Sequence, residues 1–212
     1  MTYPIVLTNL ASVRCVVVGG GAVAERKVDG LLAGGARPVV ISPNLTQRLA
    51  AWRAAGQIEH LAREYLPGDL AGAALAFAAT DDSAANAAVA AEGARLGLLV
   101  NVADDPAAGS FHTAATVRRG ELLLAVSTGG HSPALAARVR GELAERYGDE
   151  YGQLLALLGG LRAGLAQRVA PERRATLWRA LIDGPLLGWL RAGDDARAEE
   201  YARAQVAQAA EE

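Results

Sequence analysis

The chain has 212 residues, a formal net charge of −2 and 51% apolar residues. This length allows one full α/β domain and a smaller second unit, with enough apolar residues for a sizeable core. The nearly balanced charge lacks the strongly basic face that general attraction to nucleic-acid phosphates requires, so we expect no nucleic-acid partner.

A single cysteine, Cys15, lies inside the apolar run 13–18, which predicts a buried thiol and no intramolecular disulfide. The N-terminus lacks a basic stretch followed by a long apolar segment, so we expect no signal peptide. The longest apolar runs, such as 73–79, are too short to span a bilayer. The sequence therefore predicts a cytoplasmic protein without a membrane partner.

The first hundred residues alternate between short apolar runs and helical segments. Strands are predicted at 14–18, 38–41, 58–61, 74–79 and 98–101. Helices are predicted at 22–33, 45–55 and 84–96, the last capped by Asp82 or Ser83. Continuous apolar strands alternating with helices indicate a parallel sheet covered on both faces.

The pattern changes after Asp105-Pro106. Residues 113–118 and 121–127 are predicted to form a hairpin, because two apolar runs are joined at Arg119-Gly120. A helix is predicted over 133–147, with Ser132 as cap and a proline in its first turn. From residue 150 onward the sequence is helical, with breaks predicted near 159–160, 170–171 and 184–185.

A glycine loop joins the first predicted strand to the first predicted helix. Its sequence, GGGAVA at 19–24, fits the pattern G-x-G-x-x-A. The first glycine permits a tight turn, the second lets the backbone approach a pyrophosphate, and the small third residue lets helix and strand pack closely. Because the exposed N–H groups of a helix start attract phosphates, the loop predicts a dinucleotide site; the alternative is a glycine-rich turn without a ligand.

The acidic residue that usually binds the ribose is missing, because the second strand ends in Ser42-Pro43-Asn44. Ser42 and Asn44 are neutral candidates for the ribose hydroxyls, and no arginine stands in the usual place for a 2′-phosphate, which favours NAD over NADP. Thr80 and Asp81 follow the fourth strand, where ligands of open α/β sheets bind. The predicted cofactor-binding residues are Gly19, Gly21, Ala22, Val23, Ser42, Pro43, Asn44, Thr80 and Asp81.

Five segments carry a resemblance to a known family. They are VVGGGAVAERK (17–27), AATDD (78–82), NVAD (101–104), SF (110–111) and VSTGGHSP (126–133). In this order and spacing they resemble the precorrin-2 dehydrogenase / sirohydrochlorin ferrochelatase family, which also forms the front half of bifunctional siroheme synthases. The resemblance covers about residues 1–150, and the helical tail is similar in length and character only. The methyltransferase half of a fused synthase is expected to be absent, because the chain ends where that half would begin.

The resemblance implies a fold and a division of the chain. It implies an NAD-binding Rossmann domain at 1–112, a small β-containing dimerisation segment at 113–149 and a helical C-terminal domain at 150–212. It also implies a homodimer with each site built at the interface. The implied reaction is NAD-dependent oxidation of precorrin-2 to sirohydrochlorin, which in many members is followed by insertion of ferrous iron to give siroheme.

Asp104 follows the fifth predicted strand and matches the functional aspartate of the family. Both half-reactions need a proton acceptor, because oxidation releases a proton and metal insertion displaces two pyrrole protons. From position alone a second interpretation stays open, in which Asp104 or Asp105 only starts the turn at Pro106. The resemblance favours Asp104 as the catalytic residue.

The implied substrate carries acetate and propionate arms, for which arginine is the best partner. The candidate substrate-binding residues are His112, Arg118, Arg119 and Arg138, and the alternative is that they belong to a solvated face. No clustered Cys/His spacing predicts a permanent metal site, so ferrous iron is expected as a substrate only. Two rival functions remain, a regulatory NAD-binding module without turnover and a chelatase that has lost the oxidation.

Overall fold

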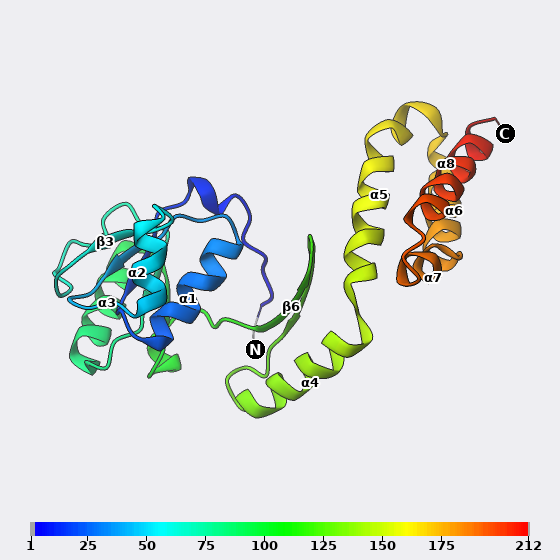
Figure 1. The fold of residues 1–212 in the computed structure, drawn as a ribbon. Coiled ribbons are helices and arrows are strands. Elements are labelled where there is room, and N and C mark those ends of the chain that lie inside the picture. The colour runs from blue at the N-terminus through cyan, green and yellow to red at the C-terminus, as the bar shows by residue number, and fades with distance from the viewer. Residues whose placement is uncertain (1–2, 212) are drawn as a thin grey trace. The chain divides into compact units, whose positions relative to one another are not determined.

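The computed structural model describes residues 3–211 of the chain (Figure 1). It separates into two units, and the division falls between Thr113 and Ala114. Among the described residues, no helix combines the length and the apolar character needed to cross a bilayer.

The first unit is built on a parallel sheet of five strands in the order β3-β2-β1-β4-β5. The strands are β1 (Cys15–Val18), β2 (Val39–Ile41), β3 (Glu59–Leu61), β4 (Leu75–Ala78) and β5 (Leu99–Val102). All five lie where the sequence predicts them, which confirms the α/β class with a Rossmann-type sheet. Because β1 is central, the chain crosses from one half of the sheet to the other between β3 and β4.

Helices cover both faces of this sheet, as predicted. Helices α1 (Ala22–Ala33) and α2 (Gln47–Ala54) contribute Val28, Leu31 and Leu49 to one core cluster, and α3 (Ser83–Leu96) contributes Val89 to the other. Alternate side chains of β1 enter opposite clusters, so all four of its residues are buried, including the predicted thiol of Cys15. A strand buried on both faces explains why its sequence is continuously apolar rather than alternating.

Capping side chains set where two of these helices begin. Helix α2 starts two residues later than predicted, because Thr46 is its cap and accepts a hydrogen bond from the Leu49 amide at 3.2 Å. Asp82, one of the two predicted caps, begins α3 by accepting from the amides of Ala84 and Ala85. Two short 3₁₀ helices, η1 (Leu10–Ser12) and η2 (Pro106–Ala108), were not predicted.

The segment after η2 folds back along β5. The Ser110 amide donates to the Val100 carbonyl at 2.8 Å, and the Asn101 side chain donates to the Phe111 carbonyl at 2.9 Å. The Phe111 ring packs edge-on against Phe77 with centroids 5.4 Å apart. The motif residues Asn101, Ser110 and Phe111 therefore fasten the end of the first unit to its sheet.

The second unit begins with the predicted hairpin. Strands β6 (Ala115–Arg119) and β7 (Leu122–Val126) pair antiparallel and turn at residues 120–121. Helix α4 (Pro133–Arg146) follows, with Ser132 as cap and proline in its first turn, as predicted. The Arg119 guanidinium donates to the carbonyls of Ala144 and Tyr147, so it closes the end of this helix.

Four helices complete the unit: α5 (Asp149–Arg168), α6 (Pro171–Asp183), α7 (Leu186–Arg191) and α8 (Asp195–Glu211). The break predicted at Gly159-Gly160 is wrong, because α5 runs through both glycines. Each glycine costs a helix only about 1 kcal/mol, and Leu157, Leu158 and Leu161 around them pack on a buried core. The breaks at 170–171 and 184–185 are confirmed, and a further turn at Gly193 was not predicted.

Candidate functional site

Two glycines of the loop after β1 lie against the neighbouring strand ends. Gly19 has a φ of +124°, which favours glycine, and a Cβ there would lie 2.2 Å from the Ala79 carbonyl oxygen after β4. A Cβ on Gly20 would lie 1.8 Å from the Asn44 carbonyl oxygen after β2. The loop therefore threads between the ends of β2 and β4, and both positions require glycine for the approach.

Gly21 differs from the other two, because nothing lies within 4 Å of a Cβ built on it. It caps α1 with extended backbone at φ −87° and ψ −172°, and Ala24 one turn later is fully buried. The first amides of a helix have no partner within the helix and point toward its start. The space in front of Gly21 is therefore open and faces free N–H donors, which suits a pyrophosphate.

A pocket of about 920 Å³ opens at this edge of the sheet. Every predicted cofactor-binding residue lines it. These are Gly19, Gly21, Ala22, Val23, Ser42, Pro43, Asn44, Thr80 and Asp81. The lining comes from the ends of β1, β2 and β4, which are the strand ends expected to hold a ligand in an open α/β sheet.

The hydroxyl of Ser42 already has a local partner in this pocket. Its Oγ donates to the Asn44 carbonyl oxygen at 2.7 Å, and Ser42 is 9% exposed. The hydroxyl oxygen can still accept a hydrogen bond, whereas the Asn44 side chain is exposed and can donate and accept. Asp82 also lines the pocket, but one of its carboxylate oxygens is engaged in capping α3.

Asp104 is tied to the pocket by a buried amide that the sequence analysis missed. The Asn86 side chain, 1% exposed, donates to Asp104 Oδ1 at 2.9 Å and to the Thr80 carbonyl at 3.0 Å. Its own carbonyl accepts from the Thr80 hydroxyl at 2.9 Å. Asn86 therefore links the loops after β4 and β5, and no motif marks it in the sequence.

The turn at Pro106 uses the neighbouring aspartate. Asp105 Oδ1 accepts from the amides of Ala107 and Ala108 and so caps η2. The structural role left open for this dipeptide thus falls on Asp105, and the exposed carboxylate of Asp104 takes no part in that turn.

The four predicted substrate-binding residues have different surroundings. His112 and Arg118 are exposed. Arg138 is exposed and pairs with Glu142 at 3.0 Å along α4. Arg119 is directed to helix carbonyls and lies 3.3 Å from Asp149, so its guanidinium is engaged within its own unit.

The loop between β3 and β4 supplies a wall of the pocket that was not predicted. Glu64, Tyr65 and Pro67 line it, together with Ala85 and Ala88 of α3. The sequence predicts β3 itself but names no ligand-binding residue after it, although the rule that ligands gather at the carboxyl ends of strands also points to the residues after Leu61.

The fold and this pocket define the first unit as a Rossmann-type NAD(P)-binding domain. Residues 6–115 match a family model described as putative NAD(P)-binding. Residues 119–146 match one described as sirohaem biosynthesis protein central, and 150–206 one described as sirohaem synthase dimerisation region. The chain belongs to the precorrin-2 dehydrogenase / sirohydrochlorin ferrochelatase family, the N-terminal module of siroheme synthases, which confirms the predicted resemblance.

Individual relatives agree with this assignment. The chain is 38% identical over 206 residues to a siroheme synthase of Chromobacterium violaceum, which covers 97% of this chain and 44% of the relative. It is 40% identical over 205 residues to siroheme synthase 1 of Aeromonas salmonicida, and this match covers 95% of this chain and 44% of the relative. The chain thus spans less than half of the length of these relatives.

A solved structure is similar over nearly its whole length. It is that of SirC, precorrin-2 dehydrogenase, with a TM-score of 0.77 and 28% identity. The similarity covers 95% of this chain and 99% of SirC. The predicted succession of a Rossmann-type sheet, a small β segment and a helical region is therefore shared with a protein of this name.

Proposed function

We propose that this chain oxidises precorrin-2 to sirohydrochlorin with NAD as the oxidant. One observation carries the proposal: the pocket formed by the glycine loop is joined, through Thr80 and Asn86, to the carboxylate of Asp104. The similarity to SirC, named a precorrin-2 dehydrogenase, and to siroheme synthases supports this substrate class.

The residues around the pocket divide the binding of the cofactor among them. NAD, when bound, supplies the acceptor for the hydride that leaves the substrate. The open space at Gly21 and the amides of Ala22 and Val23 suit the pyrophosphate, and Ser42 and Asn44 suit the ribose hydroxyls. Thr80 and Asp81 line the pocket after β4, and Thr80 is hydrogen-bonded to Asn86, which contacts Asp104.

We assign to Asp104 the role of proton acceptor. Oxidation removes a hydride and a proton from the macrocycle, so a base must lie beside the bond that loses them. Asn86 donates to Oδ1 and thereby fixes the orientation of the carboxylate, and Oδ2 is the oxygen that we assign to the proton. The same group would accept pyrrole protons if ferrous iron is inserted as a second substrate, the reaction that the name siroheme synthase implies for the relatives.

The remaining partners follow from the chemistry of the substrate. We propose His112, Arg118 and Arg138 as partners for its carboxylate arms and assign Arg119 to the end of α4 instead. The described dimerisation region at 150–206 supports a homodimer in which 113–149 and 150–212 take part. The cytoplasm, where NAD is available, is the proposed location.

The direct test incubates the purified protein with precorrin-2 and either NAD or NADP, and follows the absorption spectrum with and without ferrous iron. Oxidation with NAD is the expected result. A regulatory module would bind NAD without oxidising the substrate, and a chelatase alone would insert iron into sirohydrochlorin without oxidising precorrin-2. Either result would refute the proposed reaction.

Two variants then test Asp104. Asp104→Asn keeps an oxygen that accepts from Asn86 but cannot take the proton, whereas Asp104→Ala removes both. Both variants should bind NAD normally and lose turnover by roughly 10²–10⁴-fold, as expected when a general base is lost. Near-normal oxidation by Asp104→Asn would show that the residue only positions its neighbours.

A further inference from the structure

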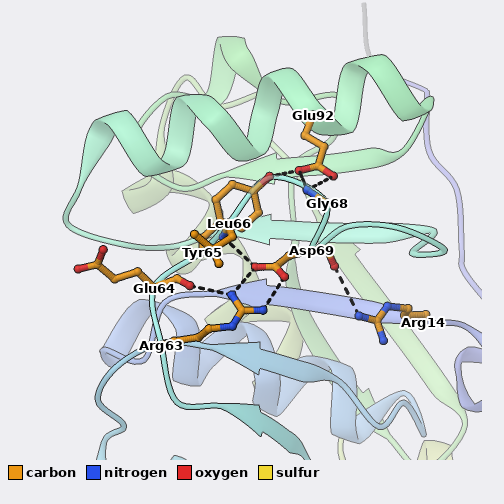
Figure 2. Close-up of polar contacts among 8 residues, drawn as sticks. All are labelled: Arg14, Arg63, Glu64, Tyr65, Leu66, Gly68, Asp69 and Glu92. Atoms are coloured by element: carbon orange, nitrogen blue, oxygen red, sulfur yellow. Dashed lines mark hydrogen bonds and ion pairs between the residues drawn. The ribbon is translucent and has the colours of Figure 1, made fainter.

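The loop that walls the pocket is held by a buried carboxylate. Figure 2 shows Glu92 of α3 accepting hydrogen bonds from the Tyr65 hydroxyl and from the Gly68 amide. The Gly68 nitrogen lies 3.0 Å from both carboxylate oxygens. Glu92 is 8% exposed, so this contact is largely shielded from water. Burial, and then the hydrogen bond to Glu92, raises the pKa of Tyr65, which keeps its hydroxyl a donor.

A second contact fixes the same loop at its other side. Arg63 forms two hydrogen bonds of 2.7 Å with the two oxygens of Asp69, and the Leu66 amide donates to Asp69 at 2.8 Å (Figure 2). The hydrogen bond from Arg63 is the main reason that the pKa of Asp69 is lowered. The loop that carries these pocket-lining residues is therefore tied within itself and to α3 by contacts of the protein's own groups.

The order of the strands decides which end of a dinucleotide meets this loop. Strands β2 and β3 lie on one side of β1, and β4 and β5 on the other. A dinucleotide bound across such a sheet places its pyrophosphate at the glycine loop and its two nucleosides on opposite sides. Because Asp104 follows β5, the reacting nicotinamide belongs to the β4–β5 side, and the adenosine belongs to the side of β2 and β3.

Three acidic residues line the pocket, and they differ in position and in their contacts. Asp81 and Asp82 follow β4, and Asp82 caps α3. Glu64 follows β3, beside the end of β2 that lacks the usual acid. Its side chain is exposed, and Figure 2 shows its carboxylate pointing away from the Arg63–Asp69 pair, so that pair does not neutralise it.

We propose that Glu64 is the specificity-determining acid of the cofactor site: its carboxylate accepts hydrogen bonds from the adenosine ribose and repels a 2′-phosphate, which selects NAD over NADP. Tyr65 and Glu92 act as positioning residues that hold Glu64 at the ribose. This inference rests on the proposed function, since it requires a dinucleotide in the pocket. An acid at this place would give a chain without an acid after β2 a means of selecting NAD over NADP.

Calorimetric titration with NAD and with NADP tests the proposal without relying on activity. The wild type should bind NAD more tightly than NADP. Glu64→Gln should tighten NADP binding by about tenfold, because the repulsion between the carboxylate and the 2′-phosphate is removed, while NAD binding changes less. Glu59→Gln is the matched control, because Glu59 is exposed on β3 and does not line the pocket; its cofactor preference should equal that of the wild type.

The positioning role has its own readout. Tyr65→Phe and Glu92→Gln should weaken the binding of AMP several-fold and leave the binding of nicotinamide mononucleotide unchanged, measured at temperatures where circular dichroism shows each variant folded. Equal loss for both nucleotides would show general destabilisation and would overturn the positioning role.

The outcomes separate this inference from the proposed function. A wild type that binds both dinucleotides equally, or a Glu64→Gln variant that keeps the wild-type preference, overturns the role of Glu64 and leaves the oxidation of precorrin-2 untouched. A wild type that binds neither dinucleotide overturns both.

Discussion

Replacing Gly21 by aspartate should separate cofactor binding from folding. Gly21 is the cap of α1, its backbone is extended, and nothing lies within 4 Å of its Cβ position. An aspartate at such a position can accept from the first amides of the helix, which is the role that caps normally play. The fold should therefore tolerate Gly21→Asp, although the new carboxylate occupies the space assigned to the pyrophosphate.

The substitution Gly21→Asp should raise the stability of the fold slightly and lower the affinity for NAD. A capping aspartate in place of glycine stabilises a helix by a few tenths of a kcal/mol, and its charge near the helix start adds about 0.3–1 kcal/mol. The same charge near 4 Å from a phosphate costs about 1 kcal/mol per phosphate charge even in water. Two phosphate charges therefore predict at least a tenfold loss of NAD affinity, before the loss of the amide donors is considered.

Calorimetric titration measures the NAD affinity, and urea unfolding of the same preparation measures the stability. Gly30→Asp is the matched control, because Gly30 is an exposed position in the same helix with open space at its Cβ and does not line the pocket. Gly21→Asp should lose NAD affinity at unchanged or higher stability, whereas Gly30→Asp should bind NAD normally. Unchanged affinity in a folded Gly21→Asp protein would refute the assignment of the pyrophosphate site.

Two further predictions concern stability and assembly. The lowered pKa of Asp69 means that its ion pair with Arg63 stabilises the fold above the unfolded pKa of about 3.9 and that this contribution is lost as pH falls through the lower folded value. Urea unfolding at pH 7 should find Asp69→Asn less stable than the wild type by about 1 kcal/mol, a modest value because solvent screens the ion pair at Arg63, which is 40% exposed. The difference in unfolding free energy should shrink toward about pH 3, near the unfolded pKa of the carboxyl. A difference that stays constant with pH would contradict the role of the charge. The hairpin at 113–127 should pair with its counterpart in a C2 dimer, because an isolated two-stranded sheet is marginal, and sedimentation at micromolar concentration should find a dimer; a stable monomer would count against it.

The parts of the molecule that sequence reasoning found are those governed by local rules. The glycine loop, the buried strands and the caps Asp82 and Ser132 each depend on residues adjacent in sequence, so their patterns can be recognised. All nine predicted cofactor residues line one pocket for the same reason, since they directly follow β1, β2 and β4.

The parts that were missed depend on contacts between distant residues. Asn86 lies in an alanine-rich helix with nothing local to mark it, yet it contacts Asp104, which lies 18 positions away. Glu64 lines the pocket from a loop that is tied to Glu92, whose carboxylate contacts Gly68 across 24 positions. Arg119 was predicted to bind substrate, but its guanidinium donates to carbonyls at the end of α4, a contact between residues distant in sequence. The unbroken α5 shows a related limit, since packing outweighed the weak helix preference of two glycines.

The same arrangement of two consecutive aspartates occurs twice at the carboxyl edge of the sheet. Asp81-Asp82 follows β4 and Asp104-Asp105 follows β5, and in each pair the second aspartate caps the next helix through Oδ1. The cap fixes the backbone at that point, and the first aspartate is then presented to the pocket or to Asn86. The second aspartate is thus structural in both pairs, so Asp105→Ala is an unsuitable control for Asp104, because it would loosen the backbone that carries the neighbouring carboxylate. Asp105→Asn, whose amide oxygen can still accept from the Ala107 amide, isolates the charge of Asp105 from its capping role and is the control that the geometry supports.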